Sequence, residues 1–199
     1  VDVSIIILRD KPASSGGVPV IDAATVSNYW KIAKERYAQV GIIVQWTGPT
    51  VEDPPAGVDL SDDLLYKTAE APTIVAPETK ALIDALGTTN TTADIHVFYV
   101  NYVLAFGSRF GGAAIGDYAV DESEENYIYN ILLGGYVTSP WGGYAAAHEL
   151  GHLLTDAGHP TSDTWRLMQG NTLTTTGSTG SRRFTESEET STRGNTHAY

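Results

Sequence analysis

Three segments at the start of the chain constrain its fold more than any other feature. Val3–Leu8 is a short apolar run typical of a buried strand. Asp22 can cap a helix whose apolar residues recur every three or four positions up to Val40, and Gly41 is suited to end that helix. The apolar run Ile42–Trp46 is a second strand. This strand–helix–strand order predicts a crossover between two parallel strands, and therefore a fold of the α/β (α+β) class.

Further elements follow along the chain. Pro49–Ala76 is rich in Pro and Asp and is predicted to be a loop with one short helical turn near Leu64. The next helix is expected to begin at Pro77, which suits a first turn, and to stop at Gly87. Beyond it we predict three strands, of which the glycine-rich one is best tolerated at a sheet edge: Asp94–Val103, the glycine-rich Gly111–Val120, and Tyr127–Val137.

The composition excludes several classes of protein. A net charge of −12 argues against nucleic-acid binding, because a basic patch is unlikely to form against that background. With no cysteine, disulfides and thiolate chemistry are excluded. No apolar run approaches the roughly 20 residues needed to cross a bilayer. The 199 residues suit a single domain, and the composition, with Val at position 1, leads us to expect a secreted, extracellular protein.

The segment YAAAHELGHLLTDAGHP contains three of the five histidines in the chain. His148 and His152 are four residues apart, so on a helix they project from one face and can bind the same zinc ion. Glu149 is rotated by about 100° from His148 and would lie beside the ion, where a general base for a zinc-bound water is needed. The alternative is an ordinary helix with two solvent-facing histidines. The apolar neighbours Ala145–Ala147 and Leu153 argue against that alternative.

A catalytic zinc takes three protein ligands, and the third is less certain than the first two. His159 is the natural choice, because Gly158 can make the turn that brings the chain back to the ion. Asp156, one turn beyond His152, is an alternative, although it could instead accept a hydrogen bond from a ligand histidine. A downstream carboxylate, Glu186 or Glu189, is a further alternative.

These residues resemble the metzincin clan of zinc endopeptidases, whose pattern is HExxHxxGxxH followed by a methionine-containing turn. HELGH supplies the first five positions unchanged. The chain then departs from the pattern: Thr155 stands at the position of the family glycine, and His159 comes one residue late. Met168, the only methionine, follows within WRLMQGN and resembles the family's Met-turn beneath the metal.

The resemblance implies a zincin-like fold that covers residues 1–199. The N-terminal lobe, about 1–157, would hold a twisted mixed sheet and two main helices, one of them the zinc helix. The small irregular C-terminal lobe, about 158–199, would end in a helix, which we expect to begin at Thr185.

In this family an edge strand above the cleft pairs with the extended substrate. The corresponding positions here are expected to be Ala113, Ala114, Ile115 and Gly116. The acidic turn Asp121–Asn126 is a weaker candidate for Ca²⁺, since such turns are usually only solvated.

We therefore expect a zinc metalloendopeptidase, in which Zn²⁺ is held by three histidines and Glu149 is the general base. Its substrates would be peptides or proteins, and it would be a secreted bacterial monomer. Two alternatives stay open: a zincin with a carboxylate as third ligand, of the gluzincin or aspzincin type, and a non-catalytic metal-binding protein.

Overall fold

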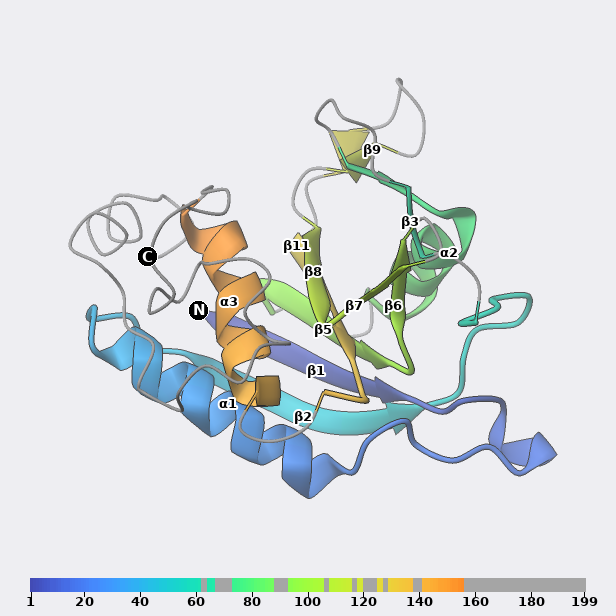
Figure 1. The fold of residues 1–199 in the computed structure, drawn as a ribbon, viewed down its shortest axis with the longest axis horizontal. Helices are drawn as coiled ribbons and strands as arrows, with labels where there is room; N and C mark the ends of the chain where they lie inside the picture. Colours follow the sequence, from blue (N-terminus) through green and yellow to red (C-terminus); the bar gives the residue numbers. More distant parts are fainter. Residues whose placement is uncertain are drawn as a thin grey trace.

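The computed structural model describes residues 1–61, 64–66, 73–87, 93–105, 108–115, 118–119, 125–126, 129–137 and 141–155. Within these ranges the fold is mixed α/β, with three α-helices and a five-stranded sheet in the order β2-β1-β5-β11-β8 (Figure 1). The strands of this main sheet are β1 (Asp2–Leu8), β2 (Gln45–Glu52), β5 (Ile95–Val100), β8 (Gly112–Ile115) and β11 (Tyr129–Gly134). The helices are α1 (Ala23–Ala38), α2 (Pro77–Leu86) and α3 (Trp141–Thr155), with a short 3-10 helix at Ala13–Ser15.

The predicted crossover at the start of the chain is confirmed. β1 pairs in parallel with both β2 and β5, and α1 connects β1 to β2. The Asp22 carboxylate caps α1 by accepting a hydrogen bond of 2.8 Å from the backbone N–H of Thr25. Beyond the helix, Gly41 has a φ of 81°, which lies in the left-handed region that glycine adopts without strain.

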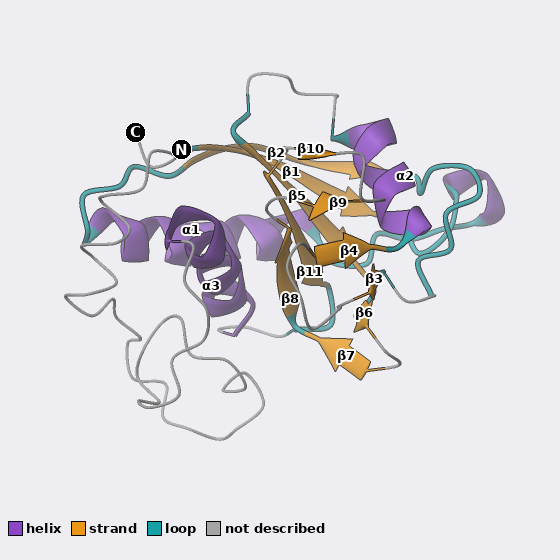
Figure 2. Cartoon of the chain, turned by 90° about the horizontal axis from the view of Figure 1, so that it is seen from above, coloured by secondary structure: helices purple, strands orange, loops and turns teal. Residues whose placement is uncertain are grey.

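Helices cover both faces of the main sheet, and this explains why β1, from Val3 onward, and β5 are buried along their whole length without alternation. In β1, Ile5 and Ile7 belong to the core cluster that includes α1 and α3, whereas Ile6 and Leu8 belong to the cluster that includes α2. Figure 2 shows α1 and α3 on one side of the sheet and α2 on the other. A strand buried on both faces reads as a continuous hydrophobic run.

The second strand differs from its prediction. β2 begins at Gln45 and continues through Pro49 to Glu52, whereas Ile42–Trp46 was expected to be strand and the residues from Pro49 onward loop. Gly48, with a φ of 94°, accompanies a shift in the pairing register with β1. Since β2 lies at the edge of the sheet, Pro49 is tolerated despite its missing N–H.

A second sheet is the main feature that the sequence did not predict. It has the strand order β10-β9-β4-β3-β6-β7, and Leu64 leads into β3, not into the expected helical turn. Two of the expected strands are each divided between the two sheets. The strands of the second sheet are β3 (Leu65–Tyr66), β4 (Thr73–Val75), β6 (Val103–Ala105), β7 (Ser108–Phe110), β9 (Tyr118–Ala119) and β10 (Glu125–Asn126). Strands of two or three residues are too short to show a periodic pattern.

Other predicted elements agree with the structure or lie outside its described part. The helix from Pro77, the strand within Tyr127–Val137 and the glycine-rich edge strand are confirmed as α2, β11 and β8. The predicted C-terminal lobe, 158–199, lies outside the described residues. None of the helices in the described part is both long and apolar enough to cross a membrane.

Two glycines allow α3 to pack closely on α1. A Cβ atom on Gly142 would lie 2.1 Å from Cε2 of Tyr29, and one on Gly143 would lie 2.6 Å from Cδ1 of Ile32. The Tyr29 ring is fixed, since it is buried and its hydroxyl donates a hydrogen bond of 2.9 Å to the carbonyl of Val137. The first turn of α3 therefore has no room for a side chain on the face that meets α1.

We predict that Gly142→Ala lowers the free energy of unfolding, because an overpacked contact costs about 1–3 kcal/mol and the better helix propensity of alanine returns only about 1 kcal/mol. Gly143→Ala should cost less, since its shortest contact would be 2.6 Å, to Cδ1 at the end of the partly exposed Ile32 side chain, although the 2.9 Å contact with Cβ of Ile32 still requires a small shift of the helices. Urea unfolding of both variants checks the order. A Gly142→Ala protein as stable as the wild type would contradict this packing.

Candidate metal centre

Helix α3 carries the residues of the candidate site in an apolar setting. The residues Ala145–Ala147, Leu150, Leu153 and Leu154 are buried, as the sequence predicted. His148 and Glu149 are also buried, with exposed fractions of 7% and 6%, whereas His152 is partly exposed. Two polar side chains of α3 are thus buried among apolar ones.

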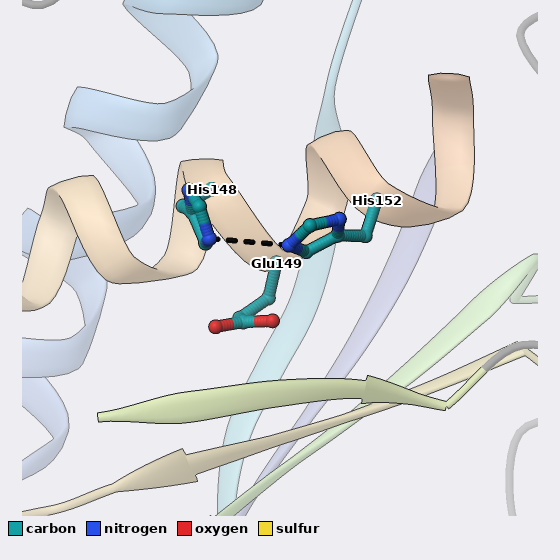
Figure 3. A group of neighbouring side chains, drawn as sticks. All are labelled: His148, Glu149 and His152. Carbon is teal, nitrogen blue, oxygen red and sulfur yellow. Dashed lines mark hydrogen bonds between the residues drawn. The ribbon is translucent and has the colours of Figure 1, made fainter. Parts of the chain in front are cut away.

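The two histidine rings face each other across one turn of α3 (Figure 3). Their Nε2 atoms are 3.1 Å apart, their ring centroids are 4.7 Å apart, and the ring planes are nearly perpendicular at 87°. Two Zn–N bonds of 2.0–2.1 Å at a tetrahedral angle separate the nitrogens by about 3.3 Å. The observed pair of nitrogens fits one zinc ion to within a few tenths of an ångström.

The donor set also suits zinc. One ligand atom from each of His148, Glu149 and His152 can be chosen so that all lie within 4.8 Å of one another. Imidazole and carboxylate groups are common zinc ligands, and catalytic zinc sites combine three of them with an open position. The residues present can therefore hold a metal ion, and the two histidine nitrogens have a separation that suits zinc.

Glu149 points from α3 toward the strands of the main sheet (Figure 3). The strand nearest to it is β8: a Cβ atom built on Gly112 would lie 2.7 Å from Cγ and 2.9 Å from Oε1 of Glu149. The carboxylate therefore lies between α3 and the edge of the sheet.

Helix α1 fixes α3 at the level of the site. The buried Tyr37 hydroxyl donates a hydrogen bond of 2.8 Å to the carbonyl of Ala147, the residue before His148. One turn earlier, the Arg36 guanidinium lies 5.5 Å from the centre of the Tyr144 ring and is 3.4 Å from its hydroxyl. Burial, together with the negative charge of Asp22, raises the pKa of Tyr29, whose ring meets Gly142 in the contact between α1 and α3.

The structure describes part of the predicted site. Ala113, Ala114 and Ile115 lie in β8, at the edge of the main sheet, as expected. Several predicted residues lie outside the described part of the chain: Asp156, Gly116, His159, Met168, Glu186 and Glu189. The candidate calcium segment is only partly described, and its last two residues, Glu125–Asn126, form β10 and not a turn.

Sequence reasoning missed two residues that touch this site, Gly112 and Tyr37. Gly112 was seen only as one of several small residues in an edge strand, and Tyr37 only as an apolar position of α1. A contact between a glycine and a glutamate from distant segments leaves no local pattern. The position of Tyr37 on the buried face of α1 was the one available signal.

Comparisons with known proteins do not assign the chain to a family. No family model matches the chain, and no curated protein matches it in sequence.

We predict that the wild-type protein binds one zinc ion per chain and that His148→Ala and His152→Ala each weaken zinc binding by more than about 100-fold, since even partners behind the ligands contribute 10- to 100-fold. The measurement is competition with a chelator of known affinity. His96→Gln, which changes a histidine of β5 and not of α3, is the matched control and should bind zinc as the wild type does. Unchanged affinity in the His148 and His152 variants would contradict the site.

Proposed function

We propose that this protein is a zinc-dependent endopeptidase with a zincin-like fold, and that it is related to the metzincins. One observation carries the proposal: the Nε2 atoms of His148 and His152 lie 3.1 Å apart, and the buried carboxylate of Glu149 lies beside them. This constellation is the one that the motif HELGH predicts.

The residues of the site would divide the chemistry among them. His148 and His152 would hold zinc, which when bound supplies a Lewis acid that polarises a carbonyl group and lowers the pKa of water. Glu149 would take a proton from the attacking water as its oxygen forms a bond to the peptide carbon. The same carboxyl group would then give the proton to the amine nitrogen as the C–N bond breaks.

The edge strand offers a place for the substrate. β8 pairs with β11 on one side, and within the described residues no strand pairs with its other side. An extended peptide can add to such an edge through backbone hydrogen bonds. Along Ala113, Ala114 and Ile115, and on to Gly116, it would lie close to Glu149, because the same strand contacts that side chain at Gly112.

For the third ligand we propose His159, on the spacing of the motif, with Asp156, Glu186 and Glu189 as alternatives. Met168 would support the site from below, as in the Met-turn that its sequence context resembles. We further propose a secreted monomer that acts on peptides or proteins; the composition, acidic and rich in uncharged polar residues, supports secretion.

We predict that Glu149→Gln lowers kcat for peptide hydrolysis by about 10²- to 10⁴-fold, the usual contribution of a general base, while one zinc ion stays bound. Cleavage of a peptide library measures the first effect and metal analysis the second. Glu35→Gln, the same change at an exposed position of α1, is the matched control. Wild-type activity in Glu149→Gln would remove Glu149 as the base, and zinc binding without hydrolysis by the wild type would favour a non-catalytic metal-binding protein.

His159→Ala tests the third ligand separately. We expect it to weaken zinc binding sharply and to abolish hydrolysis, because a zinc ion held by two side chains lacks one of its three protein ligands. Zinc affinity is again measured by chelator competition. Unchanged affinity would move the third ligand to one of the carboxylates.

A further inference from the structure

We propose that Gly112 is a positioning residue for Glu149: the missing side chain at this point of β8 leaves the space that the Glu149 side chain occupies. The inference rests on the proposed function, in which Glu149 is the general base. It assigns to the edge strand a second role, beside binding the substrate.

The space at Gly112 is filled by identified atoms. A Cβ atom there would lie 2.7 Å from Cγ of Glu149, 2.9 Å from its Oε1, and 2.9 Å from Cδ2 of Leu133. Real Cβ contacts are essentially never shorter than 3.0 Å. Any residue larger than glycine would therefore have to displace the Glu149 side chain, the Leu133 side chain or the backbone of one of the two elements.

Backbone conformation does not explain the glycine. The φ of Gly112 lies outside the left-handed region, unlike those of Gly41 and Gly48, so the conformation is open to alanine. Glycine within a strand is also unfavourable in itself, since it has no side chain to pack and loses more conformational entropy on folding. The requirement at this position is therefore one of space.

Neither β8 nor α3 can easily withdraw to make room. β8 is held in register against β11, where Gly112 is paired with Leu133, and the N–H of Gly134 donates a hydrogen bond of 3.0 Å to the carbonyl of Gly111. On the other side, α3 is held against α1 by the close contacts of Gly142 and by the hydrogen bond from Tyr37. The Glu149 side chain, with its rotatable bonds, is the part that would move.

A displacement of this carboxylate would act on the reaction and not on metal binding. The added methyl group would meet Glu149 and Leu133, and neither histidine is among the three atoms nearest to it. Misplacing a catalytic group by about 1 Å can cost on the order of 10²-fold in rate. The expected signature of Gly112→Ala is therefore a lower kcat with KM and zinc content unchanged.

The test combines kinetics with a double-mutant cycle. Gly112→Ala should lower kcat by on the order of 10²-fold, with KM and zinc stoichiometry as in the wild type. It should also lower the urea midpoint of the metal-free protein. In the Glu149→Ala background, which removes the obstructed side chain, more than half of that loss in midpoint should disappear. A wild-type kcat in Gly112→Ala would overturn the proposal, and so would a loss of activity that comes from a higher KM or from lost zinc. An equal loss in urea midpoint with and without Glu149 would also overturn it.

Gly135→Ala is the matched control, because its Cβ atom would also be overpacked, 2.7 Å from the carbonyl oxygen of Val20, but would not meet Glu149 or α3. It should lower the urea midpoint by the same amount with or without Glu149, and leave kcat unchanged. If Gly112→Ala does not fold, the Gly112→Ala/Glu149→Ala protein decides: folding supports the contact, and failure to fold overturns it. A wild type that hydrolyses no peptide would refute the proposed function, whereas the midpoint cycle would still test the contact.

Discussion

The close contact between α3 and α1 is the constraint on which the rest of the structure depends. Because Gly142 and Gly143 present no side chain to α1, the two helices approach each other closely on one face of the main sheet. The hydrogen bond from Tyr37 then fixes α3 just before His148. The position of the two histidines and of Glu149 follows from this packing, since all three are carried by α3. A site built on a rigid helix can hold its side chains more precisely than one built on a loop.

The sheet completes the site from the other side. β8 is the edge strand, and its glycine lies directly against Glu149. The same short segment therefore leaves room for the carboxylate and presents the backbone with which an extended peptide could pair. This arrangement links the two parts of the proposed function, proton transfer and substrate binding, through one strand. It also explains why glycine is suited to position 112: a larger side chain there would compete with Glu149 for space.

Local pattern predicted most of the main sheet and its helices. β1, α1, α2, β11 and α3 were expected because each is long enough to show its period or its caps, and His148 and His152 were expected on one face because they are four residues apart. The second sheet was not expected, because its strands have only two or three residues. The second strand was expected to end at Trp46, but β2 runs on through Pro49, which an edge strand tolerates. The contact of Gly112 with Glu149 could not be predicted either, since it depends on how an edge strand and a helix from separate segments meet in space.

The central claim is that the two histidines of α3 and the carboxylate beside them form a zinc centre. The most direct test is a crystal structure of the zinc-loaded protein, with anomalous diffraction recorded on both sides of the zinc absorption edge. The account predicts one strong anomalous peak at about 2.0–2.1 Å from Nε2 of both His148 and His152, with Glu149 between that peak and Gly112. No peak between the two rings, or zinc bound elsewhere on the chain, would contradict it.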